Sequence, residues 1–196
     1  MNRFFEFLRS GRVKYVGLVI LVALATGVAY FGVARHSSTG DAAHLKGGAL
    51  QAYRAADYKH AIPEFESYLV SNANDVQTRN LLEASYVQTG HLDKALELAK
   101  GTLKFTADDP DLYYRMANYA DRLGRISDSV AFLEKAVGLK PSPAFRSQLA
   151  RAYTKARRYD NATEEWRVVL DALPQDAPER NQVREEIAQV ASLKTK

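Results

Sequence analysis

The sequence contains no cysteine. Disulfides and cysteine-linked lipid anchors are therefore excluded, so the folded state must be stabilised by packing. Signatures of catalysis are also missing, because the sequence has no glycine-rich phosphate loop, no nucleophile elbow and no paired-carboxylate arrangement of the kind used in acid–base catalysis. Four histidines occur, but no two are spaced to direct their rings at one metal ion from a helix face: His36, His44, His60 and His91. We therefore expect no enzyme, no cofactor, no metal site and no small-molecule substrate.

The net charge of +4 is unevenly distributed. Four basic residues and one acidic residue lie before residue 15, so residues 35–196 carry 23 basic and 22 acidic side chains. A nucleic-acid-binding domain concentrates basic charge on itself, and no nucleic acid partner is expected here. One basic run, Arg151 to Arg158, is either a solvated helix end or a docking patch for an acidic protein segment or an anionic lipid.

The chain carries an internal repeat. Four small residues recur 34, 34 and 33 positions apart: Ala61, Ala95, Ser129 and Ala162. Each has an apolar residue three positions earlier, and three of them have a large residue four positions later, which is one face of a helix. A preceding helix has its own recurring position, occupied by Ala49, Glu83, Ala117 and Ala150. The sequence therefore predicts four helix pairs.

These pairs resemble the tetratricopeptide repeat family, whose units have small residues in both helices and a proline at the end. The likeness is strongest in the last two units: Ala117, Gly124, Leu133, Ala136 and Pro141, then Ala150, Tyr153, Tyr159, Ala162, Trp166 and Pro174. It implies an all-α, right-handed α-solenoid over 42–174, with units 42–75, 76–109, 110–142 and 143–174. Residues 175–196 follow as a capping helix and tail. The aspartates around Pro110 predict a helix N-terminus.

A run of 20 uncharged, mostly apolar residues, 15–34, precedes the repeats. At about 1.5 Å per residue it spans about 30 Å, so we expect a transmembrane helix; a cleaved signal peptide is the alternative. The basic tail 1–14 would remain cytoplasmic, which places the repeats on the periplasmic or extracellular side of a bacterial inner membrane. If the chain is instead a mitochondrial outer-membrane protein, the repeats face the cytosol. The linker is residues 35–41.

In tetratricopeptide arrays the first helices line a concave groove. Mapped by spacing onto this chain, the partner-binding residues are Tyr53, Arg54, Asn80, Gln88, Tyr114, Asn118, Arg122, Arg151 and Lys155. Tyr53 and Tyr114 are the expected anchors, because a large stiff ring orders at low entropic cost. The family's clamp for C-terminal carboxylates is not expected, because Leu50, Leu81 and Asp111 occupy three of its positions.

The resemblance and the apolar run together predict a membrane-anchored scaffold or assembly factor on the extracytoplasmic face. Its partners would be membrane or extracytoplasmic proteins, bound as an extended peptide or helix in the groove. The alternative is a permanent structural subunit of a multi-subunit membrane complex.

Overall fold

The computed structural model describes residues 42–106 and 108–195, and within this part every regular element is a helix. The expectation of an all-α fold is confirmed for these residues. The tail 1–14, the apolar run 15–34 and the linker 35–41 lie outside them. Among the described residues no helix is both long and apolar enough to cross a membrane. The chain divides into two units, Met1–Gly48 and Ala49–Lys196, and only residues 42–48 of the first are described.

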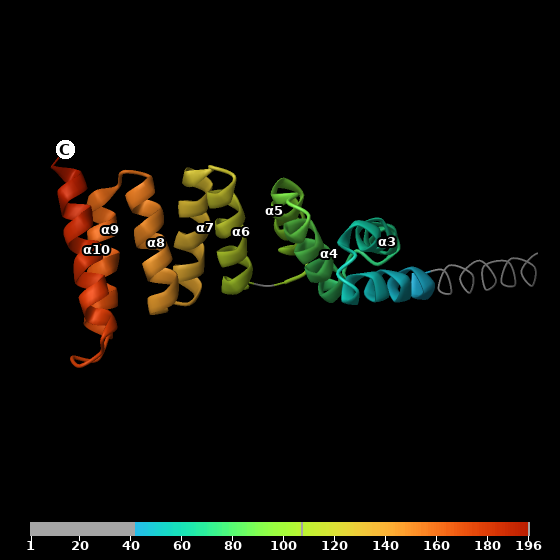
Figure 1. Ribbon diagram of the computed structural model, residues 1–196, viewed down its shortest axis with the longest axis horizontal. Helices are drawn as coiled ribbons and strands as arrows, with labels where there is room; N and C mark the ends of the chain where they lie inside the picture. Colours follow the sequence, from blue (N-terminus) through green and yellow to red (C-terminus); the bar gives the residue numbers. More distant parts are fainter. Residues whose placement is uncertain (1–41, 107, 196) are drawn as a thin grey trace, which may run out of the picture. The chain divides into compact units, whose positions relative to one another are not determined.

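The helices follow one another in pairs, and α6 with α7 and α8 with α9 lie side by side (Figure 1). Residues 42–54 are helical and precede α3 (Tyr58–Ser71). Then come α4 (Val76–Gln88) with α5 (Leu92–Thr102), α6 (Pro110–Arg122) with α7 (Ile126–Leu139), and α8 (Pro143–Lys155) with α9 (Tyr159–Ala172). The last helix, α10 (Glu179–Lys194), packs against α9.

Small side chains allow these helices to approach closely. The recurring positions of the second helices, Ala61, Ala95, Ser129 and Ala162, are all buried, and so are Ala49, Ala117 and Ala150 of the first helices. Large side chains fill the space around them, including Phe65, Leu133 and Trp166. The exception is Glu83, a carboxylate that is also buried.

Local signals explain where the first helices begin. The Asp109 side chain accepts from the backbone N–H groups of Asp111 and Leu112, and Pro110 occupies the first turn of α6. The helix N-terminus predicted around Pro110 is therefore confirmed. Asp75 and Ser142 cap α4 and α8 in the same way, through Thr78 N–H and Phe145 N–H.

The turn inside each pair is the same motif four times. Ala56, Gly90, Gly124 and Arg157 all have positive φ, between 58° and 80°. In each case the next residue donates its N–H to a carbonyl five positions earlier, as Arg125 does to Ala120 at 2.8 Å. This is the Schellman arrangement, in which a left-handed residue closes the helix C-terminus. Glycine adopts it freely, whereas Ala56 and Arg157 adopt it at a conformational cost.

We therefore expect Gly124→Ala to lower the free energy of unfolding by about 1 kcal/mol, through backbone strain alone. A Cβ at this position would meet no atom within 4 Å. The reverse change, Ala56→Gly, should raise the same free energy by about 0.5 kcal/mol. Urea unfolding followed by circular dichroism measures both.

Gly138 in α7 is the matched control, because a Cβ there also meets nothing within 4 Å and its φ is not in the left-handed region. Gly138→Ala should stabilise the protein, since alanine favours helix. A neutral Gly124→Ala variant would contradict the role assigned to the turn.

Candidate functional site

A polar cleft opens between α6 and α8. Its volume is about 90 Å³, and α7 closes it from behind with Ser129 and Leu133, which are buried. Residues one helical turn apart project into it from each wall: Tyr114, Ala117, Asn118 and Asp121 from α6, and Gln148, Arg151, Ala152 and Lys155 from α8. The two alanines leave room for the cleft, and the longer side chains form its rim. The cleft therefore offers donors and acceptors on both walls.

An ion pair bridges the two walls. Lys155 Nζ lies 2.7 Å from Asp121 Oδ1, and the two side chains are 53% and 30% exposed. An exposed pair of this kind stabilises a fold by at most about 1 kcal/mol, because water and salt screen it. Either charge can therefore turn to a partner at small cost.

Arg151 connects this cleft to a second cavity. Its guanidinium lies 5.6 Å from the centre of the Trp166 ring and donates to Glu186 of α10 at 3.3 Å. The same side chain lines a cavity of about 220 Å³ between α8 and α10, whose walls include Val169 and Val183. The surface that a partner could contact thus continues from α6 across α8 to α10.

The two predicted anchor tyrosines are half-buried and partly engaged in packing. The Tyr114 ring stacks on Phe145, with ring centres 5.4 Å apart, and also lines the cleft. The Tyr53 ring meets Tyr58 and Phe65 edge-on, with centres 5.4 Å and 6.3 Å apart. Tyr114 therefore keeps an accessible part inside the cleft, whereas Tyr53 belongs to an aromatic cluster of the first pair.

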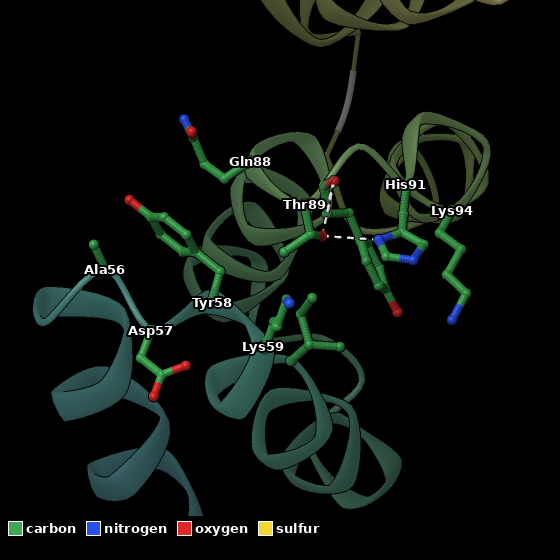
Figure 2. Close-up of a pocket in the computed structure, with 10 residues that line it drawn as sticks. Ala56, Asp57, Tyr58, Lys59, Gln88, Thr89, His91 and Lys94 are labelled. Carbon is green, nitrogen blue, oxygen red and sulfur yellow. Dashed lines mark hydrogen bonds between the residues drawn. The ribbon is translucent and has the colours of Figure 1, made fainter.

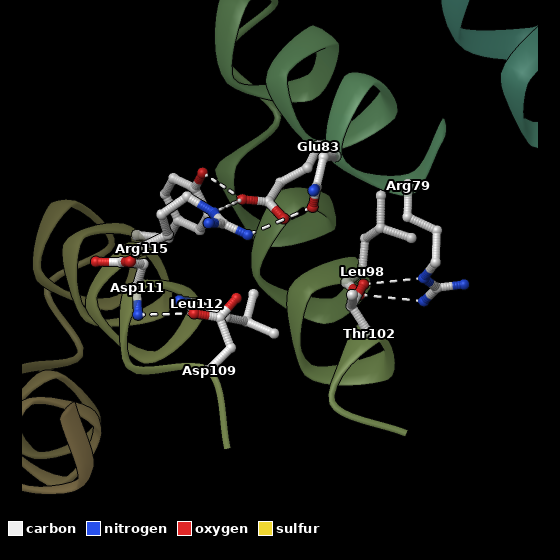
Figure 3. Close-up of polar contacts among 10 residues, drawn as sticks. Arg79, Glu83, Leu98, Thr102, Asp109, Asp111, Leu112 and Arg115 are labelled. Atoms are coloured by element: carbon white, nitrogen blue, oxygen red, sulfur yellow. Dashed lines mark hydrogen bonds and ion pairs between the residues drawn. The ribbon is translucent and has the colours of Figure 1, made fainter. Parts of the chain in front are cut away.

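A buried polar network fills the space between α4 and α6 (Figure 3). Glu83 Oε1 accepts from Arg115 Nε at 2.8 Å and from the Tyr119 hydroxyl at 2.7 Å, while Arg115 Nη2 donates to Asn80 Oδ1 at 3.4 Å. The Glu83 side chain is 3% exposed. Burial and the hydrogen bond to Glu83 raise the pKa of the Tyr119 hydroxyl well above its usual value. At this place the concave side is filled by the protein's own side chains.

Sequence reasoning missed this network. The signal was a carboxylate at a position where the other three pairs have alanine, but its partners Arg115 and Tyr119 lie 32 and 36 residues later. Only the register between neighbouring pairs brings them together. Arg115 forms an ion pair with Glu83.

Removing Arg115 should therefore destabilise the fold. We expect Arg115→Met to lower the free energy of unfolding by about 3 kcal/mol, because Glu83 would keep a buried charge without a counter-ion. The double variant Glu83→Ala with Arg115→Met should lose less than the sum of the single changes, since no charge then remains buried. Urea unfolding of the four proteins measures the cycle.

The control is Lys155→Ala, which breaks an exposed ion pair and should cost less than about 1 kcal/mol. If the losses of unfolding free energy in the two single variants add up to the loss in the double variant, Glu83 and Arg115 are not coupled.

The remaining predicted site residues lie apart from the cleft. Arg54, Gln88 and Arg122 are exposed, and Gln88 lines a different cavity near the turns before α3 and α5. The structure thus brings together Tyr114, Asn118, Arg151 and Lys155, and it leaves Tyr53, Arg54, Asn80, Gln88 and Arg122 outside this cleft. In the described part of the chain, no group of three or more histidine or carboxylate side chains is placed to hold a metal ion.

Comparison with known proteins agrees with this geometry. The sequence model of the tetratricopeptide repeat matches residues 110–143, which contain α6 and α7. The chain therefore contains a tetratricopeptide repeat in α6 and α7. The family predicted from the 34-residue spacing is confirmed, and the comparisons specify no subfamily.

Among solved structures, the chain is similar in fold to the MamA protein, with a TM-score of 0.65, 16% identity, and coverage of 79% of this chain and 85% of that one. It is also similar to YrrB, described as a tetratricopeptide-repeat protein with an unusual peptide-binding site, with a TM-score of 0.62, 16% identity, and coverage of 75% and 74%. At these identities the likeness concerns the fold alone.

One curated relative is DnaJ homolog subfamily C member 3 of Gallus gallus, which is 32% identical over 76 residues. The match covers 39% of this chain and only 15% of that protein.

Proposed function

We propose that this tetratricopeptide-repeat protein is a scaffold that holds partner proteins in the concave groove of a right-handed solenoid of four repeats, with α10 as its cap. The observation that carries the proposal is the polar cleft between α6 and α8. Two charged side chains of its rim, Lys155 and Asp121, are held by an exposed ion pair that is weak. Such side chains can exchange their contacts for those of a partner.

The chemistry of the cleft favours an extended peptide or a helix of the partner. Asn118 and Gln148 offer amide donors and acceptors for a peptide backbone, and Tyr114 offers a ring edge beside them. The continuation past Arg151 to the more apolar cavity beside α10 gives room for an aliphatic side chain. YrrB, which shares the fold and is described as having a peptide-binding site, supports the same mode of binding.

A transient scaffold is favoured over a permanent subunit. Permanent interfaces are more apolar than exchangeable ones. Within the described residues, the large hydrophobic side chains that are exposed are scattered over different elements: Val70, Phe105 and Leu139. No element of this part presents a row of them.

We further propose that residues 15–34 anchor the protein in a bacterial inner membrane, with the tail 1–14 cytoplasmic and the repeats extracytoplasmic. The support is the length of the apolar run and the four cations before it. The seven residues 35–41 reach about 25 Å at most, so the repeats would remain beside the bilayer. Membrane proteins and their extramembrane segments are then the available partners.

Site-specific photo-crosslinking in the full-length protein tests the binding proposal. A photoreactive amino acid at Asn118 should capture partner proteins in intact cells, because that side chain is exposed and lines the cleft. The matched control replaces Lys135, which is exposed on α7 and does not line the cleft. Capture at Lys135 with none at Asn118 would contradict the proposal.

The salt dependence of binding by the partners identified in this way distinguishes a scaffold from a permanent subunit. A set of partners that dissociates from uncrosslinked protein in high salt fits the scaffold, since polar contacts weaken with ionic strength. A single partner at fixed ratio that resists salt would favour the permanent subunit.

A further inference from the structure

A larger cavity lies away from the cleft, at the turns of the first two helix pairs. Figure 2 shows two groups of residues around it, one at the turn before α3 and the other at the turn before α5. Its volume of about 640 Å³ lies within the range of ligand-binding pockets, about 300–1,000 Å³. Sequence reasoning did not single it out, because no motif marks it.

The cavity carries two lysines that form no ion pair with a described acid. Lys59 and Lys94 line it and are exposed, and among the described residues neither ammonium group has a carboxylate within 4 Å. The lining also contains one carboxylate, Asp57, whose oxygens accept from the His60 backbone N–H and contact the His60 ring at 2.6 Å. Asp57 is thus held at the start of α3 and not against either lysine. His91 also lines the cavity.

The cations of the cleft differ from those of this cavity in their partners. There the cations are paired within the protein: Lys155 with Asp121, Arg151 with Glu186 and, in the neighbouring network, Arg115 with Glu83. In the cavity before α3 and α5 the two lysines have no such partner among the described residues, and Lys94 instead lies 5.5 Å from the centre of the Tyr86 ring. An external carboxylate would therefore meet ammonium groups that no described acid neutralises.

The rest of the lining suits a peptide. The rings of Tyr58 and Tyr86 and the Ile62 side chain give it an apolar portion. The Tyr86 hydroxyl already donates to Glu66, and the Thr89 hydroxyl bonds to backbone carbonyls and to His91, so these groups need no ligand. The exposed Gln88 amide is available for a peptide backbone.

We infer that this cavity is a second binding site, separate from the groove, and that it takes an acidic segment of a partner protein. Carboxylates of the segment would pair with Lys59 and Lys94, while an apolar side chain between them would cover the tyrosine rings. Pairing of this kind sets specificity and association rate and weakens with salt. The inference does not depend on the groove being a binding site.

Fluorescence anisotropy with the full-length protein in detergent tests it. The probe is a fluorescein-labelled peptide of alternating Glu and Leu, and the reference is a peptide of alternating Lys and Leu of the same length. The protein should bind the acidic peptide and not the basic one. The double variant Lys59→Glu with Lys94→Glu should bind the acidic peptide at least about tenfold more weakly.

Two controls keep the test decisive. Lys135→Glu makes the same kind of charge reversal at an exposed position of α7, and should leave binding unchanged. Lys59→Glu alone should also weaken binding, and it leaves the contact between Lys94 and Tyr86 in place. Unchanged circular dichroism verifies that the double variant and the two single variants fold.

No binding of the acidic peptide, or an equal loss in Lys135→Glu, would overturn the inference. So would lysine-dependent binding to phosphatidylserine vesicles without binding to the peptide, since the ligand would then be a lipid. Failure of Asn118 to capture partners in cells would bear on the groove and not on this site.

Discussion

Close approach of neighbouring helices is the constraint on which the rest of the structure depends. Each crossing places a small buried residue, such as Ala95 or Ala162, where a larger side chain would push the backbones apart. Repeat proteins are stabilised by each unit and its contacts with the next, so this spacing has to hold at every step. The left-handed turns at Gly90 and Gly124 then reverse the chain with the same hydrogen-bond pattern. The clefts between first helices are what this packing leaves open.

Glu83 shows how a departure from that rule changes the surface. Where the other first helices have alanine, its carboxylate is buried and held by Arg115 and Tyr119. A buried charge is tolerated only when it is paired and hydrogen-bonded, so the groove-facing Arg115 is committed to it. Between α4 and α6 this network occupies the space, whereas between α6 and α8, where Ala117 stands at the same position, a cleft is open. One substitution in the repeat thus distinguishes the two places.

The repeating parts of the fold could be predicted from the sequence. The recurrence of Ala61, Ala95, Ser129 and Ala162 predicts helix pairs, because a small residue at fixed spacing lets neighbouring helices approach closely. Along α6 and α8, four of the residues selected by helical spacing line one cleft: Tyr114, Asn118, Arg151 and Lys155. Their use in binding stays a prediction.

Contacts between helices, within one pair or between two pairs, could not be predicted in this way. Tyr53 was expected to face the groove as an anchor, but it packs on Tyr58 and Phe65, which follow the turn at Ala56. The cavity with Lys59 and Lys94 is likewise built from two turns that belong to different helix pairs. Such contacts depend on how one helix is placed against another, and periodicity within a helix carries no information about that.

The most direct measurement is hydroxyl-radical footprinting of the full-length protein, alone and with a partner that it captures. If the groove between first helices is the binding surface, Tyr114 and the other side chains of the α6–α8 cleft become protected, while Leu139 on α7 stays as reactive as in the free protein. Protection of Leu139 with an unchanged Tyr114 would contradict a binding surface in the concave groove.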